Sequence, residues 1–145
     1  MLRVPLVAVD PDLPAPRYAM PGDAGADLVA RCGVVVAAGG GRALVPTGVK
    51  VAIPEGYAGL LLPRSGLALR HGLTLVNSPG LIDSGYRDEL CALVVNTDPA
   101  ETYEIHRGDR VAQLVVVPVE QVVWDPVGGL EASERAGGRF GHTGR

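Results

Sequence analysis

The chain has 145 residues, of which 20 are glycine and 12 are proline, so helix breakers make up about one residue in five. This composition excludes a bundle of long helices, while 47% apolar against 20% charged residues argues against a disordered chain. The net charge of −3 disfavours a general nucleic-acid or anionic-membrane binder, and the length fits one domain.

Short apolar segments, broken by Gly, Pro, Asn or Asp, recur along the chain. They span residues 2–9, 33–37, 42–45, 49–53, 58–62, 73–77, 89–96, 110–117 and 121–124. Several are rich in β-branched valine, and the breaks fall at the spacing that is typical of a β-sandwich or barrel. We therefore predict an all-β domain whose one helix is a turn or two over residues 66–71, between two glycines.

Two of these segments contain valine triplets, at residues 34–36 and 115–117. A triplet is apolar on both faces of a strand, which favours strands that are covered on both sides. In so small a chain, such coverage hints at an interface between subunits.

The N-terminal residues and the cysteines bear on the compartment. No apolar run approaches the ~20 residues of a membrane helix, and Asp10 and several prolines interrupt the first segment before a signal-peptide core can form. Cys32 and Cys91 are far apart and lie in no C-x-x-C pair, which disfavours zinc and dithiol chemistry. We expect both to be ordinary small apolar residues in a reduced, cytoplasmic protein.

The composition changes after Pro126. Residues 127–145 are glycine-rich and contain one large aromatic residue, Phe140, so they cannot form a core of their own. Two interpretations stay open, a disordered tail and an arm that orders over a ligand with Phe140 on an apolar surface. We predict a domain over residues 1–126 and an arm over residues 127–145.

Four internal segments combine polar residues with tight turns, at residues 24–28, 63–80, 80–87 and 107–114. In the second segment, Arg64, Ser65 and Gly66 supply a guanidinium, a hydroxyl and a backbone N–H on one turn. These donors suit phosphate oxygens, although the same tripeptide is also common in plain turns. A Walker-type loop is excluded because the chain's single lysine, Lys50, follows valine rather than glycine.

Residues 77–85 resemble a hairpin with a glycine-rich neck. The Asn77 amide offers a donor and an acceptor to the edge of a pyrimidine, or serves only as a turn residue. The Asp83 carboxylate could orient and deprotonate water, or cap its own backbone. Tyr86 could pack against a sugar and crowd out a 2′-hydroxyl, or be a core or edge residue.

The remaining polar candidates are less specific. Asp27 is a possible outer-shell partner for a phosphate-bound Mg²⁺, which keeps its waters and uses few carboxylates. Gln113, in a mostly apolar segment, is either a structural hydrogen bonder or a substrate contact. His71 and His106 show no ligand spacing, and we expect both at the surface or in structural roles.

Taken in order, the four internal segments and the C-terminal segment resemble the five motifs of the trimeric dUTPases, the deoxyuridine triphosphate nucleotidohydrolases. The match spans residues 24–144. The resemblance implies a distorted antiparallel β jelly-roll barrel that forms a homotrimer. It also implies active sites that lie between subunits and are closed by the C-terminal arm of a third.

The same resemblance assigns roles to residues at the triphosphate. It implies phosphate binding by Arg64, Ser65, Gly66, Gln113, Arg135, His142 and Thr143. It places Asp27 near Mg²⁺, through water, with the ion held mainly by the triphosphate.

Other residues would serve the nucleoside and the reaction. The resemblance implies that uracil and deoxyribose contact Asn77, Gly80, Ile82, Tyr86 and Phe140. Asp83 would position a water that attacks the α-phosphorus of dUTP, which gives dUMP and pyrophosphate. That reaction would limit uracil incorporation into DNA and supply dUMP for dTMP synthesis.

The C-terminal segment departs from the family's pattern R-G-x-G-G-F-G-S-T-G. Here Ala136 and Arg139 replace glycines, and His142 replaces the serine. If either glycine uses a positive φ, its replacement carries a backbone penalty, which contacts from Arg139 and His142 to phosphate could offset.

Two rival functions remain open. The dCTP deaminases share the fold but use a glutamate on the strand after the third motif, where this chain has Leu93. Without that carboxylate, we expect pyrophosphate from dUTP and no ammonia from dCTP. A non-catalytic trimer that binds a nucleotide or a protein is the other alternative, and the presence of Asp83 and Tyr86 argues against it.

Overall fold

A computed structural model describes residues 1–133 of the chain. Over these residues it forms ten strands and one short helix. The strands are β1 (Leu6–Ala8), β2 (Ala26–Val29), β3 (Val34–Val36), β4 (Arg42–Val51), β5 (Tyr57–Leu62), β6 (Leu73–Leu75), β7 (Gly80–Ile82), β8 (Glu89–Asn96), β9 (Tyr103–Ile105) and β10 (Arg110–Pro118). The helix is α1 (Ser65–His71).

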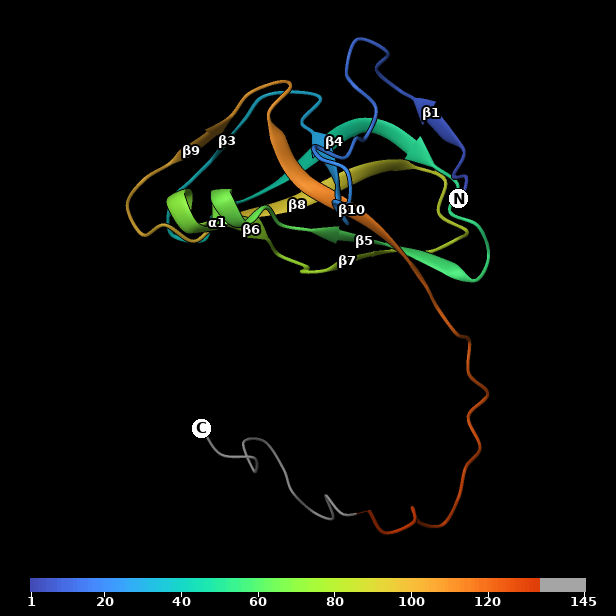
Figure 1. Ribbon diagram of the computed structural model, residues 1–145. Coiled ribbons are helices and arrows are strands. Elements are labelled where there is room, and N and C mark those ends of the chain that lie inside the picture. The colour runs from blue at the N-terminus through green and yellow to red at the C-terminus, as the bar shows by residue number, and fades with distance from the viewer. Residues whose placement is uncertain (134–145) are drawn as a thin grey trace.

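The strands form two four-stranded sheets and one two-stranded sheet, and all the pairings are antiparallel. The first sheet has the order β1-β4-β8-β6 and the second β2-β10-β5-β7, while β3 pairs with β9. Figure 1 shows the layers and the short helix at one end. This jelly-roll arrangement confirms the predicted all-β fold.

The core lies between the two larger sheets because their strands bury alternate side chains. In β8, Leu90 and Ala92 are buried, whereas Cys91 and Leu93 face outward. The inward side chains of β8 pack with residues of the other sheet, among them Leu28, Ala112 and Leu114.

Most of the predicted strands are confirmed, and β8 has its predicted bounds. Strand β4 joins two predicted segments, with a register shift between Pro46 and Lys50. At this bulge Gly48 has a φ of +78°, which glycine adopts without the steric penalty of a side chain. Strands β2, β7 and β9 were not predicted, because polar residues or glycines interrupt or closely flank their short apolar stretches.

The strand predicted over residues 121–124 is wrong. At this end of the described chain, the last backbone hydrogen bond runs from the Val119 N–H to the Gly56 carbonyl (2.9 Å). The chain then leaves the body as an extended segment (Figure 1), and Val123 and Trp124 are 96% and 86% exposed. The valines of residues 121–124 favour a strand, but a strand also needs a neighbouring backbone to pair with.

Other expectations have mixed outcomes. The predicted helix is confirmed as α1, which ends at Gly72 in the left-handed conformation (φ 63°). Val35, in the first valine triplet, is 62% exposed in the single chain, so coverage of both faces of β3 stays a prediction about the assembly. Cys32 and Cys91 are free thiols. No helix in residues 1–133 has the length and apolar composition to cross a membrane.

Candidate active site

The Asp27 carboxylate is the centre of a buried polar cluster. Asp27 lies in β2 and is 8% exposed. Its Oδ1 accepts hydrogen bonds from Arg64 Nε (3.1 Å) and Gln113 Nε2 (3.4 Å), and its Oδ2 accepts one from Arg110 Nη1 (3.3 Å). A buried carboxylate needs such partners, because burial without them costs several kcal/mol.

Strand register explains why these residues meet. Gln113 lies in β10 directly opposite Asp27 of β2, and on its other side it lies opposite Leu62 of β5. Arg64 follows Leu62 by two residues and forms the N-cap of α1. Three segments that are far apart in sequence therefore bring their polar side chains to one point across the sheet.

This cluster can bind an anion. Arg64 is half-buried and contacts Asp27 through Nε, which leaves its terminal N–H groups without a partner among residues 1–133. Ser65 and Gly66 begin α1, where the first backbone N–H groups have no acceptor within the helix. The predicted phosphate-binding residues Arg64, Ser65, Gly66 and Gln113 thus lie together.

Sequence reasoning missed two arginines beside this cluster. Arg110 shares the Asp27 carboxylate and is half exposed. Arg70 lies one helical turn after Gly66, and its Nη2 is 3.0 Å from the position of a Cβ built on Gly66. The spacing of residues 66 and 70 on a helix could have indicated Arg70, whereas the Asp27–Arg110 contact depends on the unpredicted strand β2.

A cavity of about 290 Å³ borders the cluster and is lined by Ala19, Asp23, Ala24, Gly25, Asp27 and Gln113. Residues 1–133 contain no group of three or more His, Cys, Asp or Glu side chains that could hold a metal ion. A carboxylate has about four acceptor sites, and three hydrogen bonds reach Asp27, two on Oδ1 and one on Oδ2. One acceptor site on Oδ2 therefore remains for a metal-bound water.

A second cluster lies around the end of β7 and consists of Asn77, Gly80, Ile82, Asp83 and Tyr86. Asp83 follows β7 directly. The Tyr86 N–H donates to the Asp83 carbonyl (3.1 Å) and closes a turn in which both side chains are exposed. The Tyr86 hydroxyl donates to the Glu89 carbonyl (2.9 Å). Partial burial raises the pKa of the Tyr86 phenol above its ordinary value, and the neighbouring Cys91 adds to the shift.

The hairpin predicted over residues 77–85 is wrong in its pairing. Strand β7 pairs with β5, and β6 pairs with β8 in the other sheet, so residues 76–79 cross between the sheets. Asn77 is exposed, and its Nδ2 lies 3.1 Å from the position of a Cβ built on buried Gly80. Asn77, Gly80 and half-buried Ile82 therefore lie along the same edge of the sheet as Asp83.

The two clusters lie far apart within one chain. Ile82, next to Asp83, pairs with Gly59 of β5, and Arg64 lies five residues beyond Gly59. At ~3.3 Å per residue along the strand, the Cα atoms of Asp83 and Arg64 are separated by roughly 16 to 20 Å. One copy of the described chain therefore does not bring the Asp83 carboxylate and the Arg64 guanidinium together.

Four predicted site residues, Arg135, Phe140, His142 and Thr143, lie outside the described residues. His71 and His106 are exposed, as expected. The His71 ring packs against the Tyr103 ring at 4.9 Å between centroids, and His106 lies near Glu104 and Asp109.

Comparisons with known proteins all point to one family. A family model described as dUTPase matches residues 12–144. The deoxyuridine 5'-triphosphate nucleotidohydrolase of Cutibacterium acnes is 57% identical over 141 residues, covering 97% of this chain and 91% of that protein. The protein of the same name from Thermobifida fusca is 54% identical and covers 99% of this chain and 79% of its own length.

Solved structures show the same similarity. The dUTPase of Staphylococcus bacteriophage 80alpha with dUPNHPP has a TM-score of 0.90 and 28% identity, and the alignment covers all of both chains. A mutant dUTPase from phage phi11 of S. aureus, whose structure reveals the coordination of a structural Mg(II) ion, has a TM-score of 0.82 and 28% identity. That alignment covers 90% of this chain and 100% of the phage chain.

Proposed function

This chain belongs to the dUTPase family and hydrolyses dUTP to dUMP and pyrophosphate, and we propose that its two clusters bind opposite ends of this substrate. The observation that carries the proposal is the buried Asp27 carboxylate, which holds Arg64 and Gln113 at one point on the sheet. The guanidinium, the amide and the first turn of α1 provide fixed donors for phosphate oxygens.

Arg64, Ser65, Gly66 and Gln113 bind the triphosphate. Arg64 is suited to this role because its planar guanidinium matches two phosphate oxygens at once. From the C-terminal arm, Arg135, His142 and Thr143 complete the phosphate contacts. The contact with Asp27 orients Arg64 before substrate arrives, so little ordering of the side chain accompanies binding.

Asn77, Gly80, Ile82, Tyr86 and Phe140 bind the nucleoside. The Asn77 amide and the adjacent backbone read the edge of uracil, and Phe140 stacks on its face. The Tyr86 ring packs under deoxyribose, where a 2′-hydroxyl would collide with it. The bond from the Tyr86 hydroxyl to Glu89 holds the ring in one orientation.

Asp83 activates the water. Its carboxylate is exposed beside the nucleoside cluster, as a residue that must reach a water and a substrate requires. It accepts a proton from the water as the oxygen attacks the α-phosphorus, and the bond to the bridging oxygen of pyrophosphate breaks. Fixed positive charge from Arg64 and the arm's Arg135 stabilises the charge that develops on the leaving pyrophosphate.

Mg²⁺ fits the cavity beside Asp27. Carboxylate and phosphate oxygens are the ligands that Mg²⁺ prefers, and the ion keeps several waters. The triphosphate would hold the ion, and the free acceptor site of Asp27 would receive one of its waters. Bound there, the ion would supply charge neutralisation at the leaving group.

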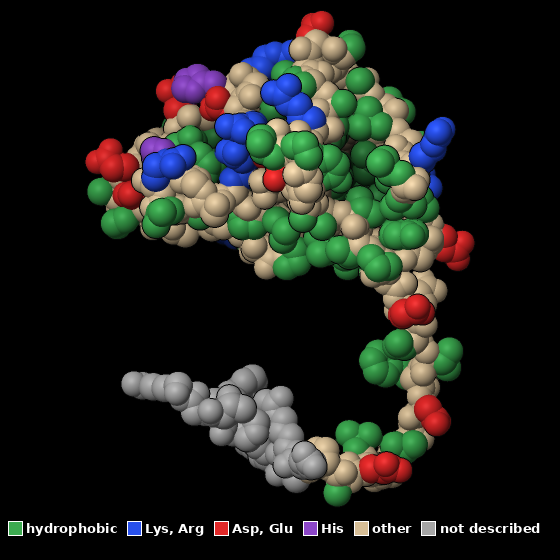
Figure 2. Space-filling model, in the orientation of Figure 1, with side chains coloured by type: hydrophobic (Ala, Val, Ile, Leu, Met, Phe, Trp, Pro, Cys, Tyr) green, Lys and Arg blue, Asp and Glu red, His purple; other side chains and the backbone are tan. Residues whose placement is uncertain are grey.

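The active enzyme is a homotrimer with its sites between subunits. This assembly accounts for the roughly 16 to 20 Å between Asp83 and Arg64 in one chain, since a neighbouring copy would supply the missing half. Apolar side chains are exposed on the body and along the departing C-terminal segment (Figure 2). Leu44, Val76 and Leu93 line an apolar cavity of about 230 Å³ on the outer face of β4, β6 and β8, which suits contact with another subunit.

The domain boundary and the compartment belong to the same proposal. Residues 1–126 form the jelly-roll domain, and residues 127–145 form the arm that closes an active site. The free thiols of Cys32 and Cys91 suit the reducing cytoplasm, where we place the enzyme.

The test of function is release of pyrophosphate from dUTP and of ammonia from dCTP. We expect turnover of dUTP with Mg²⁺ and no ammonia. Deamination requires a glutamate at the outward position on β8 where this chain has Leu93, whose apolar side chain transfers no proton. Ammonia from dCTP would contradict this assignment. Binding of dUTP without turnover would favour the non-catalytic alternative.

Removal of residues 127–145 is expected to lower turnover of dUTP by ~10- to 100-fold, because stacking on a base is worth ~1–3 kcal/mol and the arm's phosphate contacts are lost as well. The measurement is the initial rate, with the oligomeric state followed by sedimentation. Phe140→Ala in the full-length chain is the matched single change. An unchanged rate in the truncated trimer would remove the arm from the mechanism.

A further inference from the structure

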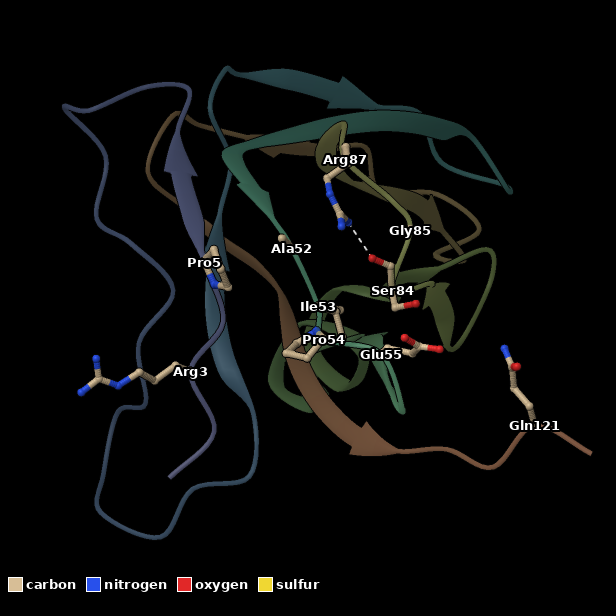
Figure 3. Close-up of a pocket in the computed structure, with 10 residues that line it drawn as sticks. All are labelled: Arg3, Pro5, Ala52, Ile53, Pro54, Glu55, Ser84, Gly85, Arg87 and Gln121. Carbon is tan, nitrogen blue, oxygen red and sulfur yellow. Dashed lines mark hydrogen bonds between the residues drawn. The ribbon is translucent and has the colours of Figure 1, made fainter.

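The Arg87 side chain folds back over the turn that carries Asp83 and Tyr86. Its Nη1 donates to the carbonyl of Ser84 (2.6 Å) and to the carbonyl of Tyr86 (2.8 Å). Figure 3 shows the guanidinium directed at the Ser84 carbonyl. One charged nitrogen thus joins two carbonyls of the turn, and charge-assisted bonds of this kind are stronger than neutral ones.

Little else holds this turn against the body. Asp83, Gly85 and Tyr86 are exposed, and apart from the chain neighbours of Gly85, none of the described residues has an atom within 4 Å of a Cβ built on Gly85. A cavity of about 610 Å³ lies beside the turn, with Ser84, Gly85 and Arg87 on one wall and Arg3 and Glu55 elsewhere on its lining. With open space on this side, hydrogen bonds rather than packing determine where the turn sits.

Tyr86 has a second attachment at its other end. Its hydroxyl donates to the Glu89 carbonyl, and the Glu89 carboxylate accepts the Gly48 N–H (2.7 Å) and pairs with Arg31 (3.0 Å). The phenol end is therefore tied to the bulge of β4. The backbone end, from Ser84 to Tyr86, is held by the two bonds from Arg87 together with the bond from the Tyr86 N–H to the Asp83 carbonyl.

We propose that Arg87 is a positioning residue that sets both the Asp83 carboxylate and the Tyr86 ring through the carbonyls of Ser84 and Tyr86. The inference rests on the proposed roles of these two residues. The inference has a distinctive consequence. Arg87 does not contact the substrate, yet its loss should change two properties together, the rate of water attack and the exclusion of ribonucleotides.

The test compares Arg87→Ala and Arg87→Lys with wild type, using kcat and KM for dUTP and for UTP. We expect Arg87→Ala to lower kcat for dUTP by ~10- to 100-fold, as a small misplacement of catalytic groups does, and to raise the ratio of UTP to dUTP in kcat/KM by several-fold. Arg87→Lys should recover part of both effects, since an ammonium also donates to carbonyls. The melting temperature and the trimer should stay close to those of wild type.

Arg3→Ala is the matched control. Arg3 lines the same cavity, but its guanidinium points away from the Ser84–Arg87 turn (Figure 3). Its loss should therefore leave unchanged both kcat for dUTP and the ratio of UTP to dUTP in kcat/KM. Unchanged kcat and unchanged discrimination in Arg87→Ala would overturn the inference. So would a loss of kcat without a change in discrimination, because a merely structural role predicts that pattern.

Failure of this inference is distinguishable from failure of the proposed function through Asp83→Asn in the same assay. If Asp83→Asn is inactive and Arg87→Ala behaves as wild type, only the role of Arg87 is lost. If Asp83→Asn is fully active, the proposed mechanism fails and the inference fails with it.

Discussion

Asp83→Asn is expected to lower dUTP turnover by ~10²–10⁴-fold, the range over which general-base catalysis contributes. The amide has nearly the shape of the carboxylate, but it cannot accept the proton of the attacking water. The side chain is exposed at the end of β7, so the fold should tolerate the change. Release of pyrophosphate from dUTP is the measurement, and the affinity for a non-hydrolysable dUTP analogue should change little.

Asp88→Asn is a suitable control for Asp83→Asn. Asp88 lies in the same connection between β7 and β8, its side chain is 87% exposed, and its one ion pair within residues 1–133, to Lys50, is long (3.8 Å). Loss of such an exposed pair has little effect, so turnover should stay near that of wild type. Undiminished turnover in Asp83→Asn would contradict the role of this carboxylate.

Arg64→Ala is expected to lower kcat/KM for dUTP by ~10²–10³-fold, the loss that follows removal of a fixed charge-stabilising donor. The guanidinium links the buried Asp27 carboxylate to the phosphates, and Arg110 keeps that carboxylate paired when Arg64 is gone. The fold should therefore survive while phosphate binding is lost.

Arg64→Lys separates charge from geometry. Lysine keeps the positive charge but lacks the fork that spans two phosphate oxygens and the Nε that reaches Asp27. We expect an intermediate kcat/KM, with most of the loss in the affinity for the triphosphate. Wild-type kinetics in Arg64→Ala would show that this end of the sheet does not bind the substrate.

Local patterns predicted those features of the fold that depend on neighbouring residues. Strand β8 is visible in the sequence as a continuous apolar run over residues 90–95, and α1 ends at Gly72, the second of the two glycines that marked the predicted helix. The polar residues of the site were also visible, because Asp27, Arg64 and Gln113 interrupt apolar or glycine-rich stretches. Their contact at one carboxylate was not visible, because it depends on pairing among β2, β10 and β5.

The errors have a common physical cause. The segment at residues 121–124 has the composition of a strand, and residues 77–85 have the composition of a hairpin turn, but pairing is decided by backbones that are distant in sequence. Strand β7 finds its partner in β5, about 20 residues earlier. Arg110 was overlooked for the same reason, since its contact with Asp27 crosses from β10 to an unpredicted strand.

The claim that one active site combines residues of different chains is tested by mixing two inactive variants. Asp83→Asn and Arg64→Ala each lose one half of the site, so each should be inactive alone. If the halves come from neighbouring subunits, about a quarter of all sites are intact in the trimers formed from equal amounts, by random assortment around the symmetric ring. We predict that co-expression or joint refolding restores about that share of wild-type turnover. No restored activity in trimers that demonstrably contain both variants would contradict the shared site.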